Sequence, residues 1–163
     1  LLRGVTDRIV GPLNRRRFDL WDLMMRQKSP ITLADIVEAF VRPDVESLEA
    51  LQERAPTVAH FLGKTYADAT PWIQEMVVEQ FAPIRQRFLH LISAALPEMA
   101  ADELEWRLAR VSALVVNLFA TWPSGGMSRA EAELTVQRMV AFTTGALQSA
   151  PPVAVQQEGG GAH

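Results

Sequence analysis

The sequence predicts an all-α protein, and three observations lead to that prediction. Apolar residues recur at steps of three and four along most of the chain, and helix-start signals precede several of these runs. No useful length of the sequence alternates polar and apolar residues as a half-buried strand would. With 163 residues, 48% of them hydrophobic, the chain can build one domain with a continuous core. We expect one helical domain over residues 1–149 and a disordered Pro- and Gly-rich tail over residues 150–163.

The first third of the chain contains helical patterns that prolines interrupt. Residues 1–26 form one such pattern, and the Gly-Pro pair at 11–12 predicts a kink or a join between two helices. A short helix is expected over residues 32–42, beginning at a capping box and ending where Pro43 follows. Residues 44–67 remain ambiguous, since they fit either one broken helix or two short ones.

A long helix is expected between Thr70 and residue 96. Thr70 is the predicted N-cap, and Pro71 is suited to the first helical position because its missing N–H costs nothing there. Pro83 lies inside this helix and removes one backbone donor, so a bend is expected near it. Because kinked helices often border cavities, this region is a candidate ligand site.

Two further helices are expected near the end of the domain. The first covers residues 102–122 and opens with Asp102 in a carboxylate version of the capping box. Its second half, residues 111–120, is apolar almost all round, which predicts burial on two sides. The second helix follows a turn at two glycines and begins at a capping box at Ser128.

Composition excludes several functional classes. The net charge of −3 and the absence of a long basic run argue against strong nucleic-acid binding by this chain, and the arginines at 15–17 are interpreted as a solvated helix face. The chain has no cysteine, and His60, His90 and His163 lie too far apart for a recognisable metal set. No nucleophile with a partner and no phosphate loop is present, so we expect neither an enzyme nor a cofactor. No apolar stretch fits a signal peptide, which predicts a cytoplasmic protein.

Three segments resemble the regulatory domain of TetR-family transcriptional repressors. Residues 1–17, LLRGVTDRIVGPLNRRR, resemble the segment that follows the DNA-binding domain, whose signature ends in a Leu that opens the next helix. The stretches ITLADIVEAFVRP at 31–43 and LEWRL at 104–108 are similar in style to the fatty-acid-responsive branch. The resemblance covers about residues 1–149. The chain starts at Leu1, so we expect the family's helix-turn-helix upstream, and operator DNA would be bound only through it.

The resemblance implies a homodimer in which the last two long helices pair with their copies as a four-helix bundle. This implication agrees with the wide apolar surface at 102–149. A monomer in which residues 44–67 cover that surface is the alternative. The predicted interface residues are the mainly apolar side chains of these two helices: Leu108, Val111, Ser112, Val115, Val116, Phe119, Val136, Met139, Val140, Thr143 and Leu147.

We expect a small apolar effector, with fatty acids or acyl-CoA as examples, to bind beside the Pro83 bend and alter operator binding. The alternative is a helical interaction or scaffold domain with a filled core and no effector. The predicted ligand-binding residues combine cavity walls with polar anchors: Met24, Phe40, Gln80, Phe81, Ile84, Arg85, Phe88, His90, Trp106 and Asn117. Asn117 needs a hydrogen-bond partner, which could be the ligand, a buried water or its own copy across a dimer axis.

Overall fold

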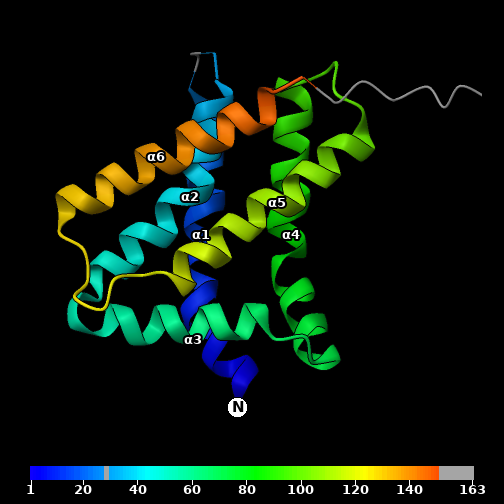
Figure 1. The fold of residues 1–163 in the computed structure, drawn as a ribbon. Helices are drawn as coiled ribbons and strands as arrows, with labels where there is room; N and C mark the ends of the chain where they lie inside the picture. Colours follow the sequence, from blue (N-terminus) through cyan, green and yellow to red (C-terminus); the bar gives the residue numbers. More distant parts are fainter. Residues whose placement is uncertain (28–29, 151–163) are drawn as a thin grey trace, which may run out of the picture.

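The protein is all-α in the computed structural model, which describes residues 1–27 and 30–150 (Figure 1). This confirms the predicted fold class, and no strand occurs in the described ranges. The tail expected to be disordered, residues 150–163, lies outside the described ranges except for residue 150. The elements are α1 (Leu2–Arg26), α2 (Leu33–Ala50), the 3-10 helix η1 (Gln52–Arg54), α3 (Ala55–Ala67), α4 (Pro71–Ala95), α5 (Ala101–Ala120) and α6 (Arg129–Gln148).

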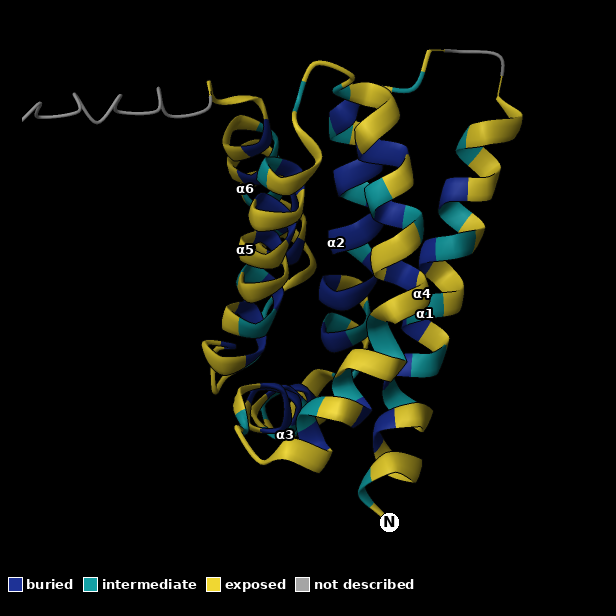
Figure 2. Cartoon of the chain, turned by 90° about the vertical axis from the view of Figure 1, so that its right-hand side faces the viewer, coloured by how far each residue is buried: buried dark blue, intermediate teal, exposed yellow. Residues whose placement is uncertain are grey.

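Helix α2 occupies the middle of the molecule. Figure 2 shows it between α5 and α6 on one side and α1 and α4 on the other, with α3 across the base. More than half of its residues are buried, because other helices pack on both sides of it. None of the helices in the described part of the chain combines the length and apolar character needed to cross a membrane.

Two helices continue through prolines at which the sequence predicted a break. Pro12 lies inside α1, so residues 1–26 form one helix, not two joined helices. Pro43 lies inside α2, which runs on to Ala50, so the expected end at residue 42 is wrong. A proline inside a helix costs a backbone hydrogen bond, but Pro43 is buried and packing on both sides of it outweighs that loss.

The ambiguous segment at residues 44–67 resolves into a broken helix. Its first residues complete α2, and the break follows at Gln52, whose φ of 50° lies in the left-handed region and cannot continue a helix. Helix α3 then begins at Ala55, with Pro56 in its first turn, where a proline is tolerated.

Helix starts were predicted correctly where the cap is local. The capping boxes of Thr32 with Asp35 and of Ser128 with Glu131 are both present, each with reciprocal hydrogen bonds. This confirms the predicted starts of α2 and α6.

Two other predicted caps are wrong. Helix α5 starts one residue early, after Ala100, so Asp102 lies in the first turn and accepts a hydrogen bond from the backbone N–H of Glu103 at 2.9 Å. Thr70 precedes α4 as expected, with Pro71 at the first position, but its side chain caps nothing. Asp68 accepts a hydrogen bond from the backbone N–H of Thr70 at 2.8 Å.

The close approach of α3 to α5 depends on Gly63. A Cβ atom at this position would lie 3.0 Å from the backbone nitrogen of Ala120, which is closer than side chains normally approach. The small residues at both positions therefore let the two helices pack tightly at the base of the molecule.

Arg107 closes the end of α6. This buried side chain on α5 donates from Nη1 to the carbonyl oxygens of Ala146, Leu147 and Ser149 at 2.7 to 3.0 Å. Its Nε atom donates to Glu103 at 2.7 Å. The guanidinium satisfies carbonyls that have no partner within the helix and also complements the negative end of the helix dipole.

Replacing Arg107 with Met is therefore expected to lower the free energy of unfolding by about 1–3 kcal/mol, because buried carbonyls of α6 lose their donor. Urea unfolding followed by circular dichroism measures the change. The control is Arg16→Met at an exposed position of α1, expected within about 0.5 kcal/mol of the original protein. Equal effects of the two substitutions would contradict the capping role.

Candidate functional site

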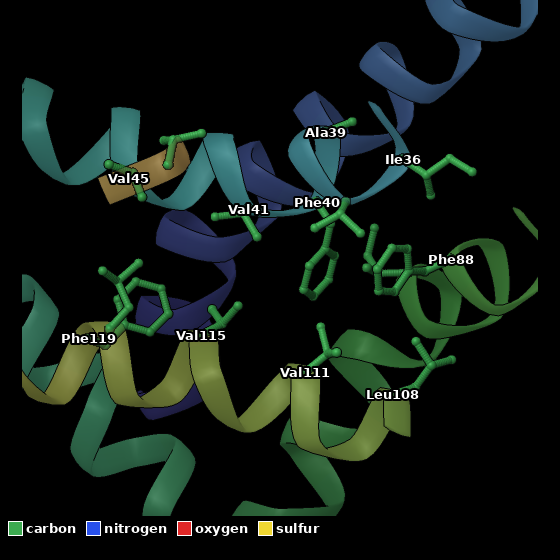
Figure 3. Packing of buried hydrophobic residues seen from close by; sticks show 14 of the residues in the cluster. Ile36, Ala39, Phe40, Val41, Val45, Phe88, Leu108, Val111, Val115 and Phe119 are labelled. Carbon is green, nitrogen blue, oxygen red and sulfur yellow. The ribbon is translucent and has the colours of Figure 1, made fainter. Parts of the chain in front are cut away.

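An elongated apolar cavity of about 470 Å³ lies between α4 and α5, with its inner end on α1, α2 and α3. This volume is within the range of small-molecule sites in proteins. In Figure 3, Leu108 and Val115 point from α5 toward the region that contains the rings of Phe40 and Phe88. The lining residues are mostly apolar: Arg17, Phe40, Tyr66, Val77, Val78, Phe81, Ala82, Ile84, Arg85, Gln86, Phe88, Leu89, Leu108, Ser112, Val115 and Val116.

Stacked aromatic rings form one wall of the cavity. Phe40 on α2 and Phe88 on α4 lie nearly parallel, with ring centroids 4.5 Å apart. Trp21 on α1 stacks on the same Phe88 ring at 5.8 Å, so three helices meet at this one side chain. At the other end of the wall, Tyr66 packs edge-on to Phe81 at 5.3 Å. These contacts fix the wall in place whether or not the cavity is occupied.

Arg17, one half of a buried ion pair, lines the inner end of the cavity. Arg17 on α1 and Asp44 on α2 are each only 1% exposed, and Nη2 of Arg17 donates to Oδ2 of Asp44. The same guanidinium donates from Nε to the backbone carbonyl of Phe40 at 2.9 Å and from Nη1 to Oδ1 of Asn14 at 2.7 Å. Each partner charge is therefore compensated, as a buried charge requires.

Sequence reasoning missed this ion pair. The run at 15–17 was interpreted as solvated, which is correct for Arg15 and Arg16 but wrong for Arg17. Successive residues of a helix are about 100° apart, so one member of such a run can face inward. The available signal was Asp44, a carboxylate placed between the apolar residues of α2, since a buried acid needs a cationic partner.

Tyr66 supplies the second polar group at the inner end. Burial and the nearby Asp44 carboxylate raise the pKa of the Tyr66 hydroxyl, and the Arg17 guanidinium opposes that rise. Burial likewise raises the pKa of the Asp44 carboxyl, against the opposing effect of Arg17. The tyrosine hydroxyl is thus protonated at neutral pH, and it has no hydrogen-bond partner among the described residues. It can donate a hydrogen bond to a bound molecule.

The structure brings half of the predicted ligand-binding residues together. Phe40, Phe81, Ile84, Arg85 and Phe88 all line the cavity, and Pro83 lies in the same stretch of α4. The helical periodicity of residues 70–96 found most of them, because every third or fourth residue of α4 faces the same neighbours.

Five other predicted ligand-binding residues lie elsewhere. Met24 packs against the core, and Gln80 points toward α1, where its Nε2 atom donates to Asp7 at 3.0 Å. His90, Trp106 and Asn117 are exposed to solvent. Trp106 is 55% exposed and does not line this cavity, but it lines a separate hollow beside Arg110 and Phe142. Asn117 was expected to need a buried partner, but α5 turns this position outward.

The structure places the predicted interface residues in three different surroundings. Four of them, Leu108, Ser112, Val115 and Val116, line the cavity. Five more pack in the core of the single chain and so have little surface to offer a partner: Val111, Phe119, Val136, Thr143 and Leu147. The remaining two, Met139 and Val140, are half-buried. The apolar width of α5 reflects burial against α3, α4 and the cavity, which sequence periodicity cannot distinguish from an interface.

A different set of apolar side chains is exposed on α5 and α6. Trp106, Leu134 and Phe142 are 55%, 43% and 65% exposed, and Arg110 lies over the Trp106 ring at 4.2 Å. Figure 2 shows the outward sides of these two helices as largely exposed. The segment at residues 44–67 does not cover them, since α3 packs at the base of α5. We call this surface, defined by Trp106, Arg110, Leu134 and Phe142, the outer face.

The chain matches a family of known domains. Residues 38–146 match the family model described as "Tetracyclin repressor-like, C-terminal domain". This range contains the whole of α3, α4 and α5 and nearly all of α6, so it includes the outer face and every cavity-lining residue except Arg17. No curated protein matches the chain. Among the described residues, no group of three or more His, Asp or Glu side chains is arranged to hold a metal ion.

Proposed function

Since this chain belongs to the family of tetracyclin repressor-like C-terminal domains, which are regulatory and not enzymatic, we propose that it senses an effector and mediates dimerisation for a one-component transcriptional regulator. The observation that supports this most directly is the apolar cavity between α4 and α5. A filled scaffold domain, the alternative, has no use for a cavity of about 470 Å³ with a mostly apolar lining. Operator DNA would be bound by a helix-turn-helix outside the residues described.

The cavity connects the effector to the helix nearest that DNA-binding part. Arg17 on α1 lines the cavity, and its partner Asp44 lies on α2, so a ligand contacts α1 through a buried side chain. A ligand shifts a conformational equilibrium only if it binds one state more tightly than the other. We propose that the occupied cavity favours one position of α1 relative to α4, and that operator binding differs between these positions.

Filling the cavity tests the effector site. A panel of medium-chain fatty acids, their methyl esters and the corresponding ketones is expected to contain compounds that raise the melting temperature saturably, because ligand binding stabilises the folded state by about 2.7 kcal/mol at 100 times its Kd. Ala82→Phe places a ring in the cavity and should abolish this shift. Thermal unfolding monitored by circular dichroism measures both proteins.

The matched control is Ala94→Phe, on the same helix, at an exposed position that does not line the cavity. It should leave the ligand-induced shift intact. If no compound shifts the melting temperature, or if both variants respond alike, the cavity is not an effector site and the scaffold alternative stands.

The outer face is the proposed dimer surface. Trp106, Arg110 and Phe142 line one hollow of α5 and α6. Exposed aromatic side chains are typical of protein interfaces, and Trp and Arg are common among residues that dominate binding. Asn117 is also exposed on α5, where its amide is free to form a hydrogen bond with its own copy in a symmetric dimer.

Trp106→Glu is expected to convert a dimer into a monomer, because a carboxylate at a closed apolar surface loses its hydration without gaining a partner. Trp72→Glu on α4 is the control, since Trp72 and Trp106 are 56% and 55% exposed but Trp72 is not on the outer face. Sedimentation velocity distinguishes the two states. A folded Trp106→Glu protein that sediments as a dimer would contradict this interface.

A further inference from the structure

The inner end of the cavity is polar but carries no net charge. Arg17 contributes one positive charge and Asp44 one negative charge, and both side chains are 1% exposed. Three of the five N–H groups of Arg17 already donate to protein acceptors. A ligand carboxylate at this end would add an uncompensated negative charge to a buried site close to Asp44, and such a charge is strongly disfavoured.

The mouth of the cavity does not provide a free cation either. Arg85 lines the cavity, but its Nη2 atom lies 3.3 Å from Oε2 of Glu105, and both side chains are 55% exposed. A ligand carboxylate there would compete with Glu105 and with water. Exposed ion pairs of this kind contribute little binding energy.

Tyr66 offers an unused donor at the inner end, in addition to the remaining two N–H groups of Arg17. Its ring is held in place by Phe81 on α4 and by Phe119 on α5, with centroids 5.3 and 5.8 Å away. The hydroxyl group has no acceptor among the described residues, although the side chain is only 9% exposed. A buried donor of this kind favours a ligand that brings an acceptor oxygen.

Building on the proposed function, we propose that the effector is an uncharged apolar molecule with an acceptor oxygen, such as a ketone, ester or ether, that accepts a hydrogen bond from the hydroxyl of Tyr66. The rest of the molecule lies along the wall formed by Phe40, Phe81 and Phe88. The raised pKa of the Tyr66 hydroxyl is consistent with this role, because the group stays a donor throughout the physiological pH range. This class excludes free fatty acids as the preferred effectors.

Displacement of the neutral dye N-phenyl-1-naphthylamine, which has no acceptor oxygen, from the purified chain tests this inference. The competitors are a methyl ketone and a carboxylate of equal chain length, 2-undecanone and undecanoate. We expect the ketone to displace the dye at lower concentration than the carboxylate. Tyr66→Phe should weaken ketone binding by about twofold to tenfold, the effect of one neutral hydrogen bond, while dye binding and undecanoate binding stay unchanged.

The outcomes separate this inference from the proposed function. The effector site stands if the dye binds and Ala82→Phe prevents that binding. The choice of an uncharged effector is nevertheless overturned if the carboxylate binds as tightly as the ketone, or if Tyr66→Phe has no effect on ketone binding. If neither dye nor competitors bind, the effector site is overturned and this inference with it. Thermal unfolding of Tyr66→Phe confirms that the variant is folded, since its hydroxyl supports no other side chain.

Discussion

Replacing Asp44 with Ala is expected to lower the free energy of unfolding by about 3–5 kcal/mol, because it leaves the Arg17 guanidinium buried without its counter-charge. Arg17 cannot reach water to compensate, since it is 1% exposed and is held by Asn14 and by the backbone carbonyl of Phe40. Chemical denaturation with urea measures the loss.

Two further proteins show whether charge is the cause. The double variant Arg17→Met with Asp44→Leu removes both charges and should recover most of the lost stability, because apolar residues of similar size can replace a buried ion pair. Glu105→Ala breaks the exposed pair with Arg85 and should cost no more than about 1 kcal/mol. If Asp44→Ala is as mild as Glu105→Ala, the pair is hydrated and the inner end of the cavity is not as described.

Phe88→Ala is expected to cost about 3–5 kcal/mol, the usual loss for a buried aromatic side chain. Phe88 is 3% exposed and stacks on both Trp21 and Phe40, so its removal enlarges the cavity and breaks the contacts that join α1, α2 and α4. The near-ultraviolet circular dichroism signal of Trp21 should also weaken, because its ring loses its stacking partner.

Trp72→Ala provides the comparison within the same helix. Trp72 is 56% exposed near the start of α4, and its removal should change stability by about 0.5 kcal/mol or less. A loss for Phe88→Ala that is no larger than this would mean that the aromatic wall does not hold the three helices together.

Local signals predicted the helices and much of the cavity wall. The reciprocal hydrogen bonds of the Thr32 and Ser128 capping boxes join residues three positions apart, so the sequence contains both partners. The side chains of Phe81, Ile84 and Phe88 recur with the helical period of α4, so their common direction was also predictable. Helix ends at prolines were less predictable, because Pro43 is accommodated by packing from other helices.

The amino-acid sequence by itself determined the all-α class, the family resemblance and the face of α4 that turns inward, because each depends on residues that are neighbours along the chain. Only the tertiary structure decided which apolar residues of α5 line a cavity and which face outward, since periodicity shows that a side is apolar but not what covers it. The pairing of Arg17 with Asp44 was also decided only by the tertiary structure. The two residues are 27 positions apart, and only the packing of α1 against α2 brings their opposite charges together and makes both of them tolerable in the interior.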